Sequence, residues 1–397
     1  MKGQSRAVLL LALGVVLIVV LAAGVALLAG RGGQAAEPAE QQAGDSGRSS
    51  PSGVPVGTGT SELGSGGSAS SAWYQLYFTD PKYPNNPADH QGGIDTHLSA
   101  LIDTATHTLD IAAYDFDLAD VAQAMARAES RGVRVRMVTD TDTLQHDVPA
   151  IQDAFKQLKD AQIPIVDDQR SAIMHDKFTV VDSEWVSTGS WNYTDGDTYH
   201  LNNNMIVIHS RDLAANYTTE FERLFITRDF GPSNTDVVPH PTLSIAGVPV
   251  QNCFSPSGHC ADLVVQAIDG AQHSVDFLAF SFTDKNIGAA MLARAKAGVT
   301  VRGVVETTGS QTSSAQYGPL KKAGLEVYTD GNPWVMHHKV IIIDGHIVIF
   351  GSFNFTASAN TSNNENLLII DDRQLAQAFE TEFARIVAVA QHPPVKP

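Results

Sequence analysis

The chain is short of positive charge. Its 397 residues include 26 Lys and Arg against 43 Asp and Glu, which gives a formal net charge of −17. Such an excess of negative charge repels polyphosphates at long range and argues against a protein that coats nucleic acid. It leaves room for a small basic pocket that holds one phosphate group. Because 43% of the residues are hydrophobic, the chain can still build a sizeable core.

Cysteine is also scarce, since Cys253 and Cys260 are the only two in the sequence. Their distance from any pair of His or Asp residues disfavours a zinc site. The two thiols either form a short local disulfide, which a compartment outside the cytoplasm allows, or stay unpaired with one or both in the core. The sequence leaves both alternatives open.

Long apolar stretches are rare as well, and the one that stands out is residues 7–30, which contain no charged side chain. A helix of this length spans a hydrocarbon core of roughly 30 Å, and it exceeds the apolar part of a cleaved signal peptide, about 7–15 residues. Lys2 and Arg6 precede it, so residues 1–30 are predicted to be a cytoplasmic tip and transmembrane signal anchor. The alternative is a cleaved signal peptide and a secreted protein. In both cases we expect the bulk of the chain outside the cytoplasm.

The rest of the chain contains a linker and a duplication. Residues 31–72 are rich in Gly, Ser, Ala, Gln and Pro, which predicts a flexible linker. Beyond it, residues 109–140 match residues 275–306. Each segment reads as a strand, an amphipathic helix, a Gly turn and a strand of alternating Val. We therefore predict two α/β halves, residues 73–240 and 241–397, each a sheet with helices on both faces.

A second repeat carries chemically active side chains. The stretches IMHDKFTVVDSEWVSTGSWNYT and VMHHKVIIIDGHIVIFGSFNFT share His, Lys, Asp, Gly-Ser and Asn at the same spacing. The β-branched runs predict a strand, on which a His and a Lys two residues apart point to the same face. A turn at the Asp then brings Gly-Ser-x-Asn back beside them. The shared residues are His175, Lys177, Asp182, Ser190 and Asn192, and then His337, Lys339, Asp344, Ser352 and Asn354.

This set of side chains suits phosphoryl transfer. Lys and Asn donate hydrogen bonds to phosphate oxygens and stabilise charge at phosphorus. One neutral His can attack phosphorus, while a second, protonated His gives its proton to the leaving alcohol and later takes one from water. The two imidazoles must lie on opposite sides of one phosphorus. A duplicated fold with pseudo-twofold symmetry provides that arrangement, so we expect two half-sites to form one site.

Two copies of HxKxxxxD, each followed by GSxN, resemble the phospholipase D superfamily over nearly all of residues 73–391. The resemblance implies a duplicated phospholipase D fold, with two mixed-sheet α/β/α halves related by pseudo-twofold symmetry. It also implies a phosphodiesterase that forms a phosphohistidine and uses no metal or other cofactor. By analogy His175 is the nucleophile and His337 the general acid and base, with Asp182 and Asp344 mainly structural. The phosphate-binding residues are then Lys177, Lys339, Asn192, Asn354, Ser190 and Ser352.

The halves differ at one position after the GSxN motif, where Glu365 aligns with Asn203. Members of the superfamily that resemble its small bacterial endonucleases carry a Glu there, which hydrogen-bonds the catalytic His. We therefore expect Glu365 to hold His337 in one tautomer and to raise its basicity, and Asn203 to orient His175. The resulting prediction is that His337 has the higher pKa, as suits a proton donor.

The substrate remains open at this level. An anchored domain with an acidic balance favours a phospholipase D that acts on phospholipids at a membrane surface. The motif details, especially NxENL after the second GSxN, resemble the endonuclease and cardiolipin-hydrolase branch, so DNA or RNA is the alternative substrate. A catalytically silent binding module is the third interpretation, although neither half lacks a His, Lys or Asn. The sequence indicates no obligate protein partner.

Overall fold

The computed structural model describes residues 67–233 and 238–394. The predicted signal anchor, residues 1–30, and almost all of the predicted linker lie outside the described residues. Among those that are described, no helix is both long enough and apolar enough to cross a membrane. The anchor therefore stays a prediction from the sequence.

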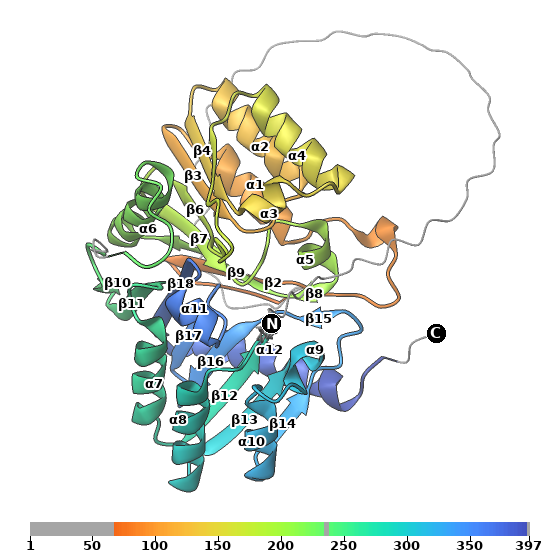
Figure 1. The fold of residues 1–397 in the computed structure, drawn as a ribbon, viewed down its shortest axis with the longest axis vertical. Helices are drawn as coiled ribbons and strands as arrows, with labels where there is room; N and C mark the ends of the chain where they lie inside the picture. Colours follow the sequence, from red (N-terminus) through yellow and green to blue (C-terminus); the bar gives the residue numbers. More distant parts are fainter. Residues whose placement is uncertain (1–66, 234–237, 395–397) are drawn as a thin grey trace, which may run out of the picture. The chain divides into compact units, whose positions relative to one another are not determined.

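Two large mixed sheets form the framework, one in each half of the chain (Figure 1). The strands of the first are β1 (Ser68–Ser70), β2 (Tyr74–Phe78), β3 (Thr108–Ala113), β4 (Arg134–Thr139), β5 (Ile165–Asp167), β6 (Lys177–Val181), β7 (Trp185–Gly189) and β9 (Asn204–His209). Those of the second are β10 (Thr242–Ile245), β11 (Val248–Ser255), β12 (Ser274–Ala279), β13 (Thr300–Val305), β14 (Glu326–Thr329), β16 (Lys339–Ile343), β17 (Ile347–Gly351) and β18 (Glu365–Asp371).

The two sheets have the same topology. The spatial order is β1-β2-β9-β7-β6-β3-β4-β5 in the first and β10-β11-β18-β17-β16-β12-β13-β14 in the second. The central strand β3 pairs parallel with β4 and antiparallel with β6, and β12 pairs in the same two ways with β13 and β16. The predicted duplication into two mixed α/β halves is confirmed.

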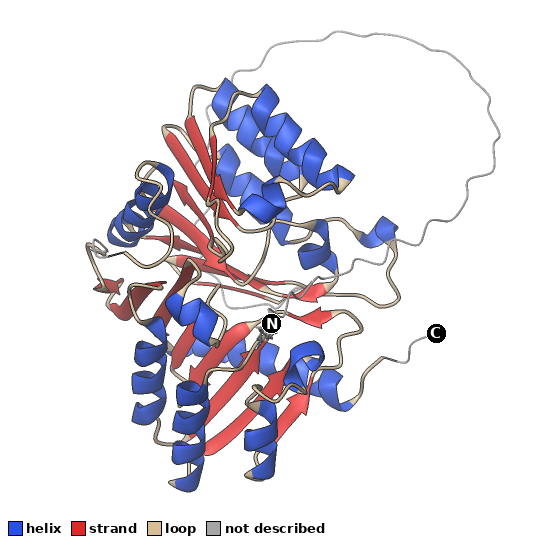
Figure 2. Cartoon of the chain, viewed as in Figure 1, coloured by secondary structure: helices blue, strands red, loops and turns tan. Residues whose placement is uncertain are grey.

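Helices cover both faces of each sheet (Figure 2). In the first half they are α1 (Ile94–Asp103), α2 (Ala119–Ser130), α3 (Thr141–Leu144), α4 (Pro149–Asp160), α5 (Asp195–Tyr199) and α6 (Arg211–Phe225), with a short 3₁₀ turn at Pro87–Asp89. In the second half they are α7 (Cys260–Gly270), α8 (Lys285–Lys296), α9 (Thr307–Ser310), α10 (Tyr317–Lys322), α11 (Ala357–Thr361) and α12 (Arg373–Gln391).

In the described part of the chain the core is divided into three clusters. One cluster packs α1, α2 and α4 on the first sheet, and another packs α7 and α8 on the second. The third contains α6 and α12 with residues of both sheets, so it belongs to both halves. Within it, Tyr217 packs on Phe254 with ring centroids 4.9 Å apart, and Phe78 packs on Phe379 at 5.2 Å. Burial of this shared apolar surface holds the two sheets together.

Short backbone pairings also cross between the halves. Strand β8 (Leu201–Asn202) pairs parallel with β15 (Val335–Met336), and Met174 forms the corresponding parallel bridge to Asn364. The segment just before each motif His therefore lies beside the segment that follows the GSxN motif of the other half. This exchange decides which side chain faces which histidine.

Two local features differ from, or add to, the sequence analysis. The predicted linker was too long, because Ser68–Ser70 forms β1 and pairs antiparallel with β2. The sequence Ser-Ala-Ser has no apolar pattern that would predict a strand. It is a strand because its backbone pairs with β2 at the edge of the sheet. Cys253 at β11 and Cys260 at the start of α7 form a disulfide, which decides between the two alternatives left open for the thiols.

Candidate active site

The motif histidines and lysines lie at the start of equivalent strands. Lys177 begins β6 and Lys339 begins β16, and each histidine comes two residues earlier. All four side chains are buried: His175 and His337 are 4% and 5% exposed, and each lysine is 1% exposed. Such burial of ionisable groups in a framework of apolar strands is costly, and it makes this place the candidate functional site.

The lysines present two buried ammonium groups with similar surroundings. Lys177 Nζ donates to the His175 carbonyl oxygen at 2.9 Å, and Lys339 Nζ donates to the His337 carbonyl oxygen at 2.7 Å. Each ammonium also lies over an aromatic ring, that of Tyr114 at 4.9 Å or Phe280 at 4.7 Å.

Burial lowers the pKa of both lysines. It lowers the pKa of Lys177 to about 8, although Glu365 and Asp197 oppose the shift, and it lowers the pKa of Lys339 well below the ordinary value. Two ammonium groups that are only partly compensated attract an anion such as a phosphodiester.

The carboxylate of Glu365 supports His175 and not His337. Its Oε2 lies 2.6 Å from His175 Nδ1, and Glu365 is fully buried. The expected pairing of Glu365 with His337 is therefore wrong, and so is the expected pairing of Asn203 with His175. The reason is the backbone exchange between halves: His175 N donates to the Asn364 carbonyl at 2.9 Å, which places the next residue, Glu365, beside the imidazole.

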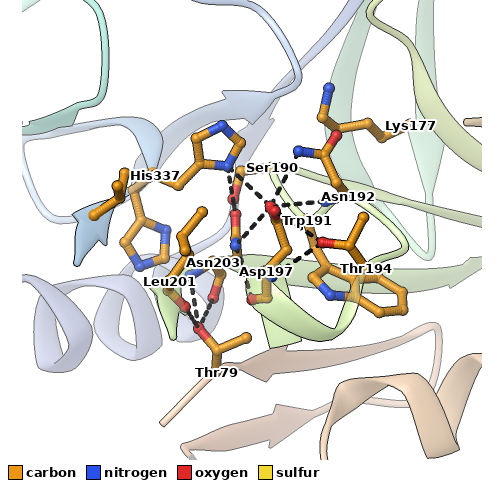
Figure 3. Close-up of polar contacts among 12 residues, drawn as sticks. Thr79, Lys177, Ser190, Trp191, Asn192, Thr194, Asp197, Leu201, Asn203 and His337 are labelled. Atoms are coloured by element: carbon orange, nitrogen blue, oxygen red, sulfur yellow. Dashed lines mark hydrogen bonds and ion pairs between the residues drawn. The ribbon is translucent and has the colours of Figure 1, made fainter. Parts of the chain in front are cut away.

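Asn203 supports His337 in the corresponding way. His337 N donates to the Asn202 carbonyl at 3.0 Å, and His337 Nδ1 lies 2.9 Å from Asn203 Oδ1. A carboxylate is nevertheless close, because Asp197 Oδ1 lies 3.4 Å from the same ring nitrogen. Figure 3 shows Asn203 between Asp197 and His337. The prediction that His337 has the higher pKa rested on a Glu365 contact that does not exist.

The two histidines belong to one electrostatic site. Burial lowers the pKa of His175 well below its ordinary value, and Lys177 and Lys339 lower it further. Burial lowers the pKa of His337 in the same way, and Lys339, Lys177 and His175 add to the shift. Each imidazole thus responds to the lysine of the other half, as a single site built from two half-sites requires.

The Gly-Ser part of each GSxN motif serves the framework. Gly189 and Gly351 have φ of +154° and +150°, and a Cβ on either would lie only 2.2 or 2.3 Å from a carbonyl oxygen of the neighbouring strand. Ser190 Oγ donates to Asn203 Oδ1 at 2.8 Å, and Ser352 Oγ accepts from the Asn366 backbone N–H at 3.0 Å. Both hydroxyls are engaged beside the residues that support the histidines, so the geometry favours a positioning role over phosphate binding.

The asparagines of the same motifs differ in their contacts. Asn192 donates its backbone N–H and its side-chain Nδ2 to Asp197 Oδ1, at 3.2 and 3.1 Å. The side-chain oxygens of Asn192 and Asn354 are buried without a hydrogen-bond partner among the described residues. An amide oxygen only accepts hydrogen bonds, so these two atoms offer no donor to a phosphate oxygen, and the phosphate-binding role of Asn192 and Asn354 stays a prediction.

The motif aspartates lie at the far ends of β6 and β16 and hold the backbone. Asp182 accepts from the backbone N–H groups of residues 106–108 at 2.7–2.9 Å, and Asp344 accepts from residues 272–274 at 2.7–2.8 Å. Burial would raise the pKa of each carboxyl, but these hydrogen bonds lower it below the ordinary value. The geometry gives both aspartates a structural role at the start of β3 and β12.

Sequence reasoning missed the residue between each His and Lys. Asp176 Oδ1 accepts from Asn366 Nδ2 at 3.0 Å, and His338 Nδ1 lies 2.9 Å from Asn204 Nδ2. Both contacts cross between the halves. Nothing in a single stretch of sequence shows that the neighbours of Asp176 and His338 belong to the other repeat.

Asp197 was missed for a different reason. It lies five residues after Asn192, outside both repeated motifs, and the corresponding position in the second half is Ala359. A signal was present in the alignment of the halves. The first half has a carboxylate at Asp197 and an amide at Asn203, whereas the second half has a carboxylate at Glu365 and none at Ala359.

Known proteins match the chain in both halves. The family model described as "Cardiolipin synthase, PLD-like domain" matches residues 98–225 and again residues 264–387. A phospholipase D of Rickettsia prowazekii is 33% identical over 162 residues, which is 41% of this chain and 79% of that relative. A mitochondrial cardiolipin hydrolase of Xenopus laevis is 35% identical over 142 residues, or 35% of this chain and 67% of the relative.

The fold as a whole is similar to a solved structure. The phosphatidylserine synthase of Haemophilus influenzae has a TM-score of 0.59 at 14% identity, and the match covers 80% of this chain and 89% of that chain. At that identity the likeness concerns the fold alone. The two family matches, by contrast, take up more than half of the chain and fall one in each repeat. The chain therefore belongs to the phospholipase D superfamily and is an enzyme of the phosphodiesterase type.

Proposed function

We propose that the chain hydrolyses head-group phosphodiester bonds of phospholipids through a phosphohistidine intermediate and without a metal. The observation that carries this proposal is the pair of buried motif histidines, each flanked by a buried lysine and each held at Nδ1 by a residue of the other half. A nucleophile and a proton donor on opposite sides of one phosphate need this arrangement.

The chemistry follows from the side chains present. The ammonium groups of Lys177 and Lys339 bind the phosphate oxygens and stabilise the charge that grows on them in the transition state. One histidine forms a bond from Nε2 to phosphorus while the other gives its Nε2 proton to the departing alcohol. Water then attacks phosphorus, loses a proton to the second histidine and releases the first.

The lipid substrate is supported by charge and by the relatives. Both relatives reported above carry the name of an enzyme that acts on a phospholipid or on cardiolipin. The net charge of −17 opposes the approach of a long polyanion such as DNA or RNA. We further propose that residues 1–30 anchor the enzyme in a membrane with its catalytic part outside the cytoplasm.

The test offers the full-length chain, in EDTA, vesicles of phosphatidylcholine or cardiolipin and, separately, single-stranded DNA and RNA. We expect release of the lipid head group and intact oligonucleotides. A variant with both Lys177→Met and Lys339→Met controls for contaminating activity. Cleaved oligonucleotides with untouched lipid would replace the proposal with the endonuclease alternative, and no turnover of any substrate would leave a binding module.

A further inference from the structure

The two catalytic histidines have unequal partners at Nδ1. His175 faces the carboxyl group of Glu365, which accepts a hydrogen bond when ionised and donates one when protonated. His337 faces the amide oxygen of Asn203. An amide oxygen only accepts. The nitrogen of His337 that carries the proton therefore depends on whether the Asn203 amide is held in this orientation.

Asp197 holds it. Asn203 Nδ2 donates to Asp197 Oδ1 and to the Asp197 carbonyl oxygen, both at 3.1 Å. These two acceptors exclude the flipped amide, because Asn203 Oδ1 would then face the two Asp197 oxygens without a hydrogen between them. On the other side, Ser190 Oγ donates to Asn203 Oδ1 at 2.8 Å and accepts from the Asn204 backbone N–H at 3.1 Å. All contacts agree that Oδ1 points at His337.

The tautomer of His337 follows from this orientation. Because Asn203 Oδ1 accepts, the proton of the neutral imidazole lies on Nδ1 and the lone pair lies on Nε2. Burial raises the pKa of Asp197 to about 6, so its carboxylate is mainly ionised at neutral pH. It lies 3.4 Å from Nδ1 and stabilises the positive charge that the ring acquires when Nε2 bonds to phosphorus.

The pair of His175 and Glu365 has the opposite property. Burial raises the pKa of Glu365 to about 8, so a proton stays within the pair at neutral pH. When the Glu365 carboxyl donates to Nδ1, the proton of His175 lies on Nε2 and faces the substrate. When Nε2 gives that proton to a leaving alcohol, the Glu365 proton moves to Nδ1. The pair of His175 and Glu365 is neutral before the step and carries one negative charge after it.

Helix capping does not account for Asp197. Its backbone N–H donates to the Thr194 hydroxyl at the start of α5, which is an ordinary N-cap contact. In the second half Thr356 caps α11 in the same way, and the residue at that position is Ala359. The cap therefore needs no carboxylate. The Asp197 oxygen that faces Asn203 and His337 is Oδ1, whereas Thr194 contacts Oδ2.

We propose that Asp197, acting through Asn203, is a positioning residue that fixes His337 as the nucleophile and leaves His175, paired with Glu365, as the proton donor. This assignment rests on the proposed phosphodiesterase function and reverses the order implied by the family resemblance. His337 Nε2 forms the bond to phosphorus, and the phosphorus–oxygen bond of the leaving alcohol breaks. The alcohol oxygen takes the Nε2 proton of His175, which later accepts a proton from the attacking water.

The first experiment uses bis(4-nitrophenyl) phosphate, a diester whose leaving group departs without being protonated. We expect the full-length His175→Gln chain to release about one equivalent of 4-nitrophenolate in a burst and to keep an acid-labile 4-nitrophenyl phosphoryl group on the peptide that contains His337. The His337→Gln chain should give neither. A burst from His337→Gln together with its absence in His175→Gln would overturn the assignment. Absence of turnover by the unsubstituted chain on this ester and on lipid would instead refute the proposed function.

The second experiment tests Asp197 directly. In the full-length chain labelled with ¹⁵N-histidine, we expect NMR shifts of His337 that report a protonated Nδ1 and a bare Nε2. In Asp197→Asn the new amide can turn its Nδ2 toward Asn203, which permits the flipped Asn203 amide. The His337 tautomers should then mix, and the burst rate should fall roughly 100-fold, as for a misplaced reactive group. Asp195→Asn, an exposed carboxylate two residues away, is the matched control and should change the rate less than about twofold. A single Nδ1–H tautomer that persists in Asp197→Asn, or a proton found on Nε2 of His337, would overturn the role of Asp197.

Discussion

The two halves share their strand order, their helices and their motifs, yet they treat the catalytic histidine differently. The first half supplies an amide, Asn203, to the histidine of the second half, and backs it with Asp197. The second half supplies a carboxyl group, Glu365, directly to the histidine of the first. Unequal Nδ1 partners give the two imidazoles different preferred protonation states, which suits a reaction that needs one as nucleophile and the other as proton donor. The comparison shows how a duplicated fold becomes asymmetric by exchanging one supporting residue on each side.

The surroundings of the site are also unequal. Asp115 and Asp117 follow β3 in the first half, where Ser281 and Thr283 follow β12 in the second. Burial raises the pKa of Asp117 to about 6. Beyond its central strand the first half therefore carries two carboxyl groups where the second half carries two hydroxyl groups.

The largest expected effect tests what the halves have in common. Lys177→Met and Lys339→Met should each lower kcat/KM for phospholipid roughly 10³-fold, because each removes a buried positive charge that stabilises the transition state. Head-group release measures the rate. The midpoint temperature of thermal unfolding, which should not fall, shows that each variant is still folded. Loss of less than about tenfold in one variant would show that only one half binds the phosphate.

The next effect tests how the halves differ. Glu365→Gln should lower turnover of phospholipid about 10²-fold, because the His175 pair loses its proton shuttle. The burst with bis(4-nitrophenyl) phosphate should persist, since that leaving group needs no proton. Equal losses on both substrates would contradict the role of Glu365 as the partner of the proton donor.

A smaller effect concerns stability and should be nearly equal in the two halves. Asp182→Ala and Asp344→Ala should each reduce the free energy of unfolding by about 2 kcal/mol at neutral pH, because several backbone N–H groups lose an acceptor. The pKa of both carboxyls is lowered in the folded chain. Their stabilisation is therefore complete above the ordinary pKa of about 4 and is lost as pH falls below it. Denaturant unfolding at neutral pH and near pH 3 measures this. A destabilisation that persists in acid would argue against the carboxylate contacts.

The last effect, of similar size, concerns a feature of the second half alone. The disulfide of Cys253 and Cys260 joins residues separated by 7 positions, so it closes a short loop. Cys253→Ser combined with Cys260→Ser should cost about 2 kcal/mol of unfolding free energy and leave activity unchanged within about twofold. Thermal unfolding with and without reductant checks this, with the double variant as the reductant-insensitive control. Loss of catalysis on reduction would show that the disulfide shapes the site.

The sequence predicted the repeated framework well because its signals are local. Alternating Val, amphipathic helices and the spacing of His175 to Lys177 all lie within short stretches of chain. The crossed support of the histidines depends instead on two-residue strands, Leu201–Asn202 and Val335–Met336, which pair across more than a hundred positions. Pairing of this kind leaves no periodic pattern. The partners of His175 and His337 were therefore predicted the wrong way round, although Glu365 and Asn203 were both recognised as the residues that support them.

The most direct test of the two-half site is a crystal structure of the chain soaked with orthovanadate, which adopts the five-coordinate geometry of phosphoryl transfer. We predict one vanadium bound between the halves, with Nε2 of His337 as one apical ligand and Nε2 of His175 within hydrogen-bond distance of the opposite apical oxygen. Vanadate held by one histidine alone, with the other directed elsewhere, would contradict the account.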